Sequence, residues 1–102
     1  PRQRQMCIRD RPDCTHVWHI FAVRCADRSA LEKHLNARGI GTNKHYPTPI
    51  HLQGAYAELG LGRGALPLAE EISATELSLP MFYGMTDAQV QAVIDAVNEF
   101  EG

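Results

Sequence analysis

Residues 44–56 read KHYPTPIHLQGAY, and this stretch divides the chain into two halves with regular patterns. Pro47 and Pro49 hold the backbone extended, because proline restricts its own φ and the conformation of the residue before it. A short helix is predicted over residues 52–59, and three glycines within residues 60–64 indicate a turn. We therefore predict a long irregular excursion between two regular parts of the chain.

The part before this excursion has the pattern of a strand, a helix and a second strand. Residues 17–25 are apolar on both alternating sets, which is typical of a strand covered on both sides and central in its sheet. Residues 29–32 have the capping-box pattern Ser-Ala-Leu-Glu, so a helix should begin there and end near Arg38, before Gly39. Residues 40–43 read as a short strand.

The part after the excursion predicts a helix, a strand and a final helix. Pro67 favours a helix start that continues over residues 68–75, and residues 77–79 are a brief strand stopped by Pro80. Residues 86–89 form a second capping box. The helix that follows carries one apolar stripe: Val90, Val93, Ile94, Val97 and Phe100. This order of elements predicts an α+β fold, a small two-layer domain in which a short, mostly antiparallel sheet packs with helices.

Length and composition indicate one globular domain. The chain has 102 residues, 44% of them hydrophobic and 22% charged. It has no apolar run near the ~20 residues of a membrane-spanning helix, and its amino end lacks the apolar centre of a secretory signal. Three cysteines form neither an even disulfide set nor a CxxC pair, so free thiols in a reducing compartment are expected. We expect a cytoplasmic protein that does not associate with membranes.

Residues 1–11 resemble a translated sequencing adapter, so they are expected to be a non-native, loosely placed scar, with the native domain over residues 12–102. The alternative is a genuine basic arm that binds nucleic acid or membrane. Without residues 1–11, six basic side chains stand against eleven acidic ones, a net charge of about −5. A nucleic-acid-binding domain is typically basic, so no nucleic-acid partner is expected.

Residues 44–56, together with residues 67–70 (PLAE) and 77–80 (LSLP), resemble the carboxyl-terminal part of the DegT/DnrJ/EryC1/StrS family. The resemblance runs from about residue 16 to residue 100. Members of this family are pyridoxal-phosphate (PLP) aminotransferases that act on nucleotide-linked keto-sugars. The resemblance implies the small domain of such an enzyme, with PLP in the full-length protein, a large domain upstream that carries the Schiff-base lysine, and a homodimer. The amino donor it implies is an amino acid such as glutamate.

The resemblance also implies which residues contact the substrate. His45 and Tyr46 match the family's His-Tyr-Pro motif, and His51 matches its following histidine. We expect these three substrate-binding side chains on one exposed rim beside the cleft, where imidazole and phenol groups can hydrogen-bond hydroxyls and phosphate. Gly54 departs from the family's proline. Two other readings stay open: surface-loop histidines without a function, and a metal site, which would need two further converging ligands.

No catalytic or cofactor-binding residue is predicted in this chain. Lys33 lies in a predicted helix and should be solvated, and Lys44 has no lysine motif of the family before it, so neither is expected to hold PLP. Residues 60–64 (GLGRG) lack the strand and helix that flank a phosphate-binding loop and are expected to be a turn. His19 is expected to be a core histidine. The isolated fragment should therefore bind no PLP and be inactive.

Two further functions stay open. One is a PLP-dependent sugar dehydratase of the same family, which only an upstream residue would distinguish. The other is a stand-alone small α+β binding module. If the chain lacks its large domain, an apolar face should be uncovered. We expect solvent-accessible side chains at four positions: Trp18, Met81, Phe82 and Tyr83.

Overall fold

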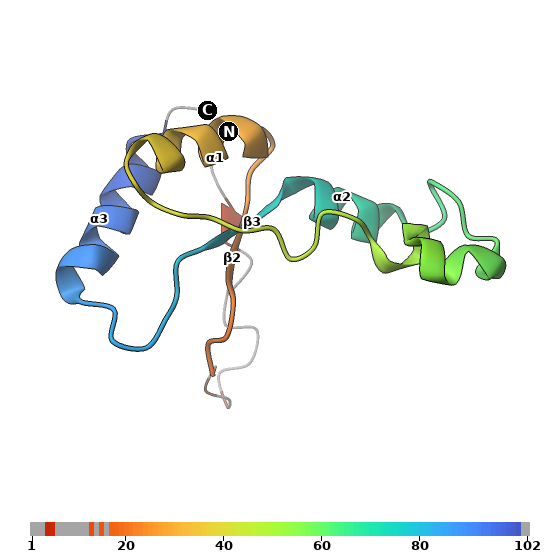
Figure 1. Ribbon diagram of the computed structural model, residues 1–102, viewed down its shortest axis with the longest axis horizontal. Helices are drawn as coiled ribbons and strands as arrows, with labels where there is room; N and C mark the ends of the chain where they lie inside the picture. Colours follow the sequence, from red (N-terminus) through yellow and green to blue (C-terminus); the bar gives the residue numbers. More distant parts are fainter. Residues whose placement is uncertain (1–3, 6–12, 14, 16, 101–102) are drawn as a thin grey trace.

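The computed structural model describes residues 4–5, 13, 15 and 17–100. Three strands, β1 (Arg4–Gln5), β2 (Phe21–Arg24) and β3 (Glu76–Leu79), form an antiparallel sheet in the order β1-β2-β3. Three α-helices accompany the sheet, namely α1 (Arg28–Ala37), α2 (Pro67–Thr75) and α3 (Asp87–Asn98) (Figure 1). The predicted two-layer α+β fold is confirmed, and β2 is the central strand of this sheet, as expected.

The first predicted strand is shorter than its apolar pattern indicated. Its pairing with β3 begins at Phe21, which lies opposite Leu79. The residue that follows Leu79 is Pro80, which has no backbone N–H to donate. The hydrogen-bonded pairing of β2 with β3 therefore ends at Phe21 and Leu79. Val17 is consequently 89% exposed. His19 is also exposed, so the prediction of a core histidine was wrong.

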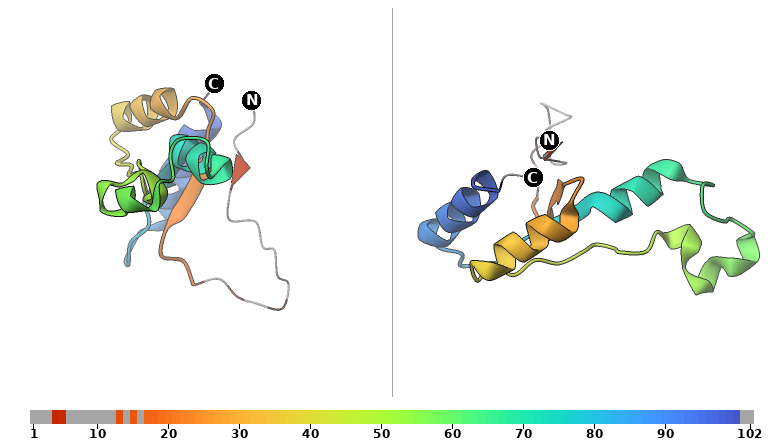
Figure 2. Two further views of the ribbon diagram at one scale, coloured as in Figure 1. Left: turned by 90° about the vertical axis from the view of Figure 1, so that its right-hand side faces the viewer. Right: turned by 90° about the horizontal axis from the view of Figure 1, so that it is seen from above.

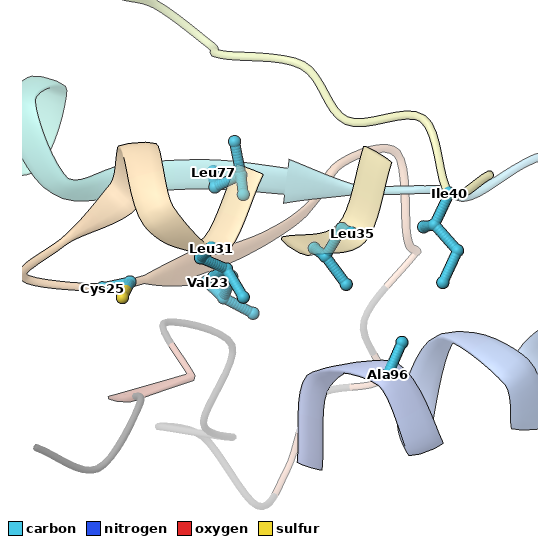
Figure 3. Packing of buried hydrophobic residues seen from close by; sticks show 7 residues of the cluster. All are labelled: Val23, Cys25, Leu31, Leu35, Ile40, Leu77 and Ala96. Carbon is cyan, nitrogen blue, oxygen red and sulfur yellow. The ribbon is translucent and has the colours of Figure 1, made fainter. Parts of the chain in front are cut away.

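The hydrophobic core lies between the sheet, α1 and α3. Val23 and Leu77 are cross-strand partners, so they share one face of the sheet, and both are buried. Leu31 and Leu35, one turn apart on α1, are fully buried against them, and Ala96 of α3 closes the cluster (Figure 3). We call β2, β3, α1 and α3 the body.

The helix starts differ from the predictions in one case and agree in the other. α1 begins at Arg28 because Asp27, not Ser29, is the cap: its carboxylate accepts a hydrogen bond from the Ala30 amide at 3.0 Å. The capping box at Thr86 and Gln89 is confirmed. The helix it begins buries only part of the expected stripe. Val93, Val97 and Phe100 pack on the core, whereas Val90 and Ile94 are exposed.

Residues 44–75 form a projection that we call the arm (Figures 1 and 2). It runs out through two short 3₁₀ helices, η1 (Ile50–Leu52) and η2 (Gly54–Leu59), and returns through α2. The single helix predicted over residues 52–59 is thus replaced by two, because Gln53 between them has extended backbone. The radius of gyration is 15.6 Å, where a compact domain of about 100 residues has ~13 Å.

Two smaller predictions are also settled by the fold. The strand expected over residues 40–43 reduces to an isolated bridge between Asn43 and Ser78. The turn expected over residues 60–64 is confirmed, since Gly60 and Gly64 have positive φ, +66° and +86°. Within the described residues, no helix is long and apolar enough to cross a membrane.

Candidate functional site

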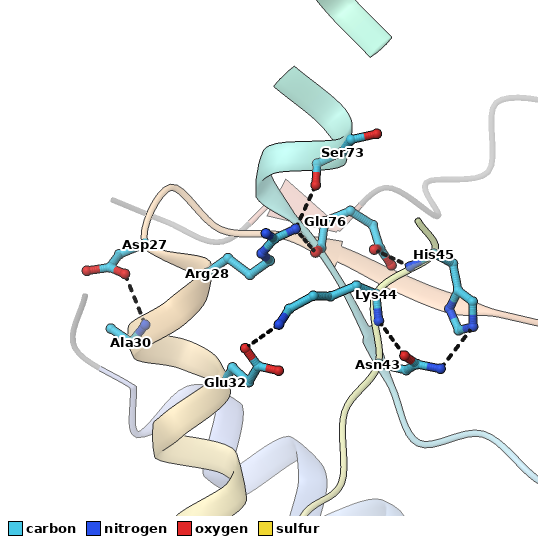
Figure 4. A network of polar contacts seen from close by, with 9 residues as sticks. All are labelled: Asp27, Arg28, Ala30, Glu32, Asn43, Lys44, His45, Ser73 and Glu76. Carbon is cyan, nitrogen blue, oxygen red and sulfur yellow. Dashed lines mark hydrogen bonds and ion pairs between the residues drawn. The ribbon is translucent and has the colours of Figure 1, made fainter. Parts of the chain in front are cut away.

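His45 lies where the chain leaves the edge of β3 and enters the arm. The backbones of Asn43 and Ser78 exchange two hydrogen bonds, of 3.1 and 2.8 Å, which fix this segment against the strand. His45 then donates its backbone N–H to Glu76 Oε2 at 2.8 Å (Figure 4). Its ring Nδ1 lies 2.8 Å from Ser78 Oγ. Two hydrogen bonds of Asn43 and two polar contacts of His45 itself therefore hold this segment on the edge of β3.

The His45 ring borders a cavity of about 270 Å³. Asn43 and Ser78 line it on the same side, and Leu79 and Met81 contribute apolar walls. Thr42 Oγ1 is buried without a hydrogen-bond partner among the described residues, and Thr42 also lines this cavity. A small apolar pocket with a few converging donors and acceptors suits a ligand that carries hydroxyl groups.

Tyr46 follows His45 and faces solvent. It is 65% exposed, and its ring meets that of His45 edge-on, with the centroids 5.4 Å apart. The peptide bond between the two residues is cis. His45 and Tyr46 are thus neighbours at the surface, as expected for two residues of one exposed rim.

His51 does not share that rim. Its side chain is buried in the arm, and its Nε2 lies 3.1 Å from Glu70 Oε1 on α2. The Gly64 amide donates to the same carboxylate oxygen at 2.7 Å. The hydrogen bond from His51 lowers the pKa of Glu70, and the amide of Gly64 lowers it further. The expectation that His51 is exposed was therefore wrong, because the His51 ring is buried in contact with Glu70. The role of His51 as a substrate contact stays a prediction.

The two lysines of the chain, Lys33 and Lys44, differ in their surroundings. Lys33 is exposed, as expected. Lys44 pairs with Glu32 of α1 at 2.7 Å, and its side chain reaches away from the His45 ring (Figure 4). Neither lysine lines the cavity beside His45. The described residues also contain no group of three or more His, Cys, Asp or Glu side chains that could hold a metal ion.

Sequence reasoning missed the residues that support His45. Glu76 and Ser78 are buried, and both contact His45. They alternate with Leu77 and Leu79 along β3, so they face away from the apolar cluster. The alternation of polar and apolar residues in the sequence indicated that Glu76 and Ser78 share one face of the strand. It did not indicate that His45, more than thirty positions earlier in the chain, contacts both of them.

The predicted uncovering of apolar side chains is confirmed. Trp18, Met81 and Phe82 are exposed, and Tyr83 is fully accessible. Further large apolar side chains are exposed along the arm: Tyr46, Ile50, Tyr56, Leu59, Leu61, Leu66 and Leu68.

Comparison with known proteins places this fold in one family. The profile of the DegT/DnrJ/EryC1/StrS aminotransferase family matches residues 2–98. The match begins inside the segment expected to be foreign, and Arg4–Gln5 form β1, whereas most of residues 1–11 lie outside the described residues. The origin of that segment, and with it the domain boundary at residue 12, stays a prediction.

The similarity to individual proteins is high but covers a small part of each. The chain is 47% identical over 89 residues to dTDP-3-amino-3,4,6-trideoxy-alpha-D-glucose transaminase of Streptomyces venezuelae, covering 87% of this chain and 24% of that protein. It is 47% identical over 70 residues to the erythromycin biosynthesis sensory transduction protein EryC1 of Saccharopolyspora erythraea, covering 69% of this chain and 19% of that protein. The crystal structure of S. venezuelae DesV in complex with a ketimine intermediate superposes with a TM-score of 0.88 at 43% identity, covering 97% of this chain and 26% of that one.

The chain thus spans about a quarter of the length of the S. venezuelae transaminase. Its fold, the order of its motifs and a profile match over nearly all of its residues agree with one another. The chain belongs to the DegT/DnrJ/EryC1/StrS aminotransferase family.

Proposed function

We propose that this chain is the carboxyl-terminal part of a PLP-dependent aminotransferase that transfers an amino group from an amino-acid donor, such as glutamate, to a nucleotide-linked keto-sugar. The observation that carries this proposal is the 47% identity to a dTDP-sugar transaminase over 87% of the chain. Bound PLP supplies the electron sink for such a transfer in the complete protein. The chain itself contributes one wall of the substrate cleft and no catalytic group.

His45 and Tyr46 are the proposed direct contacts to the sugar nucleotide. The half-buried His45 borders a cavity with polar and apolar walls, and the exposed side chain of Tyr46 meets the His45 ring edge-on. Because the ring of His51 is buried against Glu70, we propose that His51 acts on the substrate through the shape of the arm. Its loss should therefore alter the position of the segment that follows Tyr46.

The partners of the uncovered apolar surface are proposed to be the large domain of the same protein and a second copy of it. Interdomain faces commonly bury about 600–1,500 Å². The exposed apolar side chains belong to the arm and to residues 81–83, in the loop between β3 and α3. In isolation the chain should associate or bind a hydrophobic dye, and a monodisperse monomer without dye binding would support the stand-alone binding module instead.

A chimaeric enzyme tests the proposed activity. Residues 17–100 replace the matching segment of the S. venezuelae transaminase, and sugar-nucleotide amination is measured with glutamate as donor. His45→Ala and Tyr46→Phe should raise the KM for the sugar nucleotide about tenfold or more and leave the KM for glutamate unchanged. Lys33→Ala, at an exposed position on α1, is the matched control.

Two results of this experiment would contradict the proposal. A folded, PLP-loaded chimaera without amination activity would show that this chain cannot serve as the carboxyl-terminal part of a sugar-nucleotide aminotransferase. Equal increases in both KM values for His45→Ala would indicate a structural role, because only a sugar contact discriminates between the two substrates.

The chain alone is proposed to bind no PLP. It contains Lys33, which is solvated, and Lys44, which is engaged by Glu32. Titration with PLP should give no saturable visible absorbance band. A stoichiometric band that disappears in Lys44→Ala would show that this chain holds the cofactor. That result would contradict the proposal that the large domain of the complete protein binds PLP.

A further inference from the structure

The ring of His45 belongs to a chain of four side chains whose hydrogen bonds have a single consistent direction. The members, in order, are Asn43, His45, Ser78 and Glu76, and they come from the root of the arm and from β3. Figure 4 shows three of them, Asn43, His45 and Glu76. Since each contact needs one donor and one acceptor, the direction of the whole chain follows from its two ends.

At the first end, Asn43 must be a donor toward His45. The Lys44 backbone N–H donates to Asn43 Oδ1 at 2.8 Å, which identifies this atom of the Asn43 side chain as the oxygen. The atom that faces His45 is therefore the NH₂ nitrogen, Nδ2. Asn43 Nδ2 lies 3.3 Å from His45 Nε2. Because Nδ2 can only donate, Nε2 must carry the lone pair and no proton.

At the other end, Glu76 must be an acceptor. Its Oε2 accepts the His45 backbone N–H, and its Oε1 makes a short contact with Ser78 Oγ. A carboxylate with two acceptor oxygens takes the single hydroxyl proton of Ser78. Ser78 Oγ is then left to accept from His45 Nδ1, 2.8 Å away. Both ends therefore require the same state of the ring, neutral with its proton on Nδ1.

We propose that Glu76 and Ser78 are positioning residues of His45, which hold the ring in the neutral Nδ1–H tautomer so that Nε2 is an acceptor at the cavity. Beside it, the Asn43 amide is a donor, so the pair can accept from and donate to one hydroxyl group of a bound sugar. The contact between Asn43 and His45 is long for a hydrogen bond, and a ligand hydroxyl can replace it. This assignment of a ligand rests on the proposed function, whereas the tautomer does not.

Nuclear magnetic resonance of the chain, labelled in its histidine ring nitrogens, tests the tautomer at about pH 8, where free histidine is neutral. The chain contains its own references. His34 Nε2 lies 2.8 Å from the Ala96 carbonyl oxygen, and His51 Nε2 lies against the Glu70 carboxylate, so both rings must carry their proton on Nε2. His45 should therefore give the opposite pattern of ring-nitrogen correlations from His34 and His51.

Variants separate positioning from folding. Ser78→Ala should shift the tautomer ratio of His45 toward Nε2–H by about five- to tenfold, the effect of one lost hydrogen bond. Ser78→Thr keeps the hydroxyl and should restore the wild-type pattern. Glu76→Gln should act in the same direction as Ser78→Ala. Glu71→Gln, on an exposed carboxylate of α2 that pairs with Arg24, should change nothing.

The outcomes are distinct for the two proposals. A wild-type His45 with its proton on Nε2, or a tautomer ratio that is unchanged in Ser78→Ala with the amide dispersion of β2 and β3 intact, overturns the positioning role. If instead the tautomer responds as expected while His45→Ala leaves the sugar KM of the chimaera unchanged, the positioning role stands and the sugar contact fails.

Discussion

The body and the arm of this chain are held together by different forces. In the body, buried apolar side chains from two strands and two helices form one cluster. In the arm, the buried residue is a histidine, and it is held by a carboxylate. Burial of apolar surface stabilises the body without a neighbour, whereas hydrogen bonds contribute little net stability when water can replace them. The arm therefore gains less of its stability from apolar burial than the body does.

Glu70 is the centre of the arm. Glu70 lies on α2, and its carboxylate accepts hydrogen bonds from the His51 ring of η1 and from the Gly64 amide in the turn. It therefore connects three segments of the arm. At the root of the arm, Lys44 pairs with Glu32 of α1. A few polar contacts thus replace the packed core that the body has, and four measurements test this difference between the body and the arm.

The largest expected effect is a truncation in the core. Leu77→Ala should lower the free energy of unfolding by about 2–5 kcal/mol, because Leu77 is fully buried between β2 and α1. Leu68→Ala, the same change at an exposed position of α2, should cost within ~0.5 kcal/mol. Urea denaturation followed by circular dichroism measures both. Equal losses would mean that the arm is packed as tightly as the body.

A smaller effect is expected at the start of α3. Thr86→Ala should destabilise the chain by about 1 kcal/mol, because the Thr86 hydroxyl accepts the Gln89 amide and starts the helix that closes the core. Thr86→Ser keeps the hydroxyl and is the control, expected to retain most of the stability. If Thr86→Ser lost as much as Thr86→Ala, the methyl group and not the cap would matter.

A change in the arm should leave the body intact. Glu70→Gln replaces the charged acceptor shared by His51 and Gly64 with a neutral amide oxygen, which accepts more weakly, so hydrogen exchange of the Gly64 amide should accelerate several-fold. Exchange in β2 and β3 should not change. Glu71→Gln, one residue along α2, is the matched control. Acceleration throughout the sheet would show that the arm and the body unfold together.

The smallest effect is the dependence of the arm on pH. Because the pKa of Glu70 is lower in the folded chain than its ordinary value of 4.5, its contribution to the stability of the arm is complete above that value. It is lost as pH falls through the lowered folded value. The Gly64 amide resonance should shift with a midpoint below 4.5, and this step should be absent in Glu70→Gln. A midpoint above 4.5 would contradict the assigned hydrogen bonds.

Local patterns were sufficient for several elements. Pro67 and the residues after it predicted α2, and the capping box at Thr86 predicted α3, because caps and proline act within one helical turn. The same local reasoning misplaced the start of α1, where Ser29 and Asp27 are both suitable caps and only the backbone geometry selects Asp27. It also extended the first strand to Val17, since an apolar residue carries no information about whether a partner strand lies opposite.

The candidate site was predicted in part. His45 and Tyr46 lie together at the surface as the His-Tyr-Pro motif implied, but His51 is buried because Glu70, nineteen positions later, accepts its ring proton. Thr42, Asn43, Glu76 and Ser78, which surround His45, were not singled out. Each is unremarkable in its local context, and each gains its role from a residue on another element.

Local sequence patterns were enough to predict the class of fold, because propensity, capping and apolar alternation are properties of neighbouring residues. The resemblance of residues 44–56, 67–70 and 77–80 indicated the family and the motif that borders the cavity. The folded structure was needed to show which histidine is exposed, where the β2 ladder stops and which side chains contact the His45 ring. These features depend on pairs such as Ser78 with His45 and Phe21 with Leu79. Hydrogen bonds and ladder pairs act over about 3 Å in space, whatever the separation along the chain, and only the folded backbone brings such partners together.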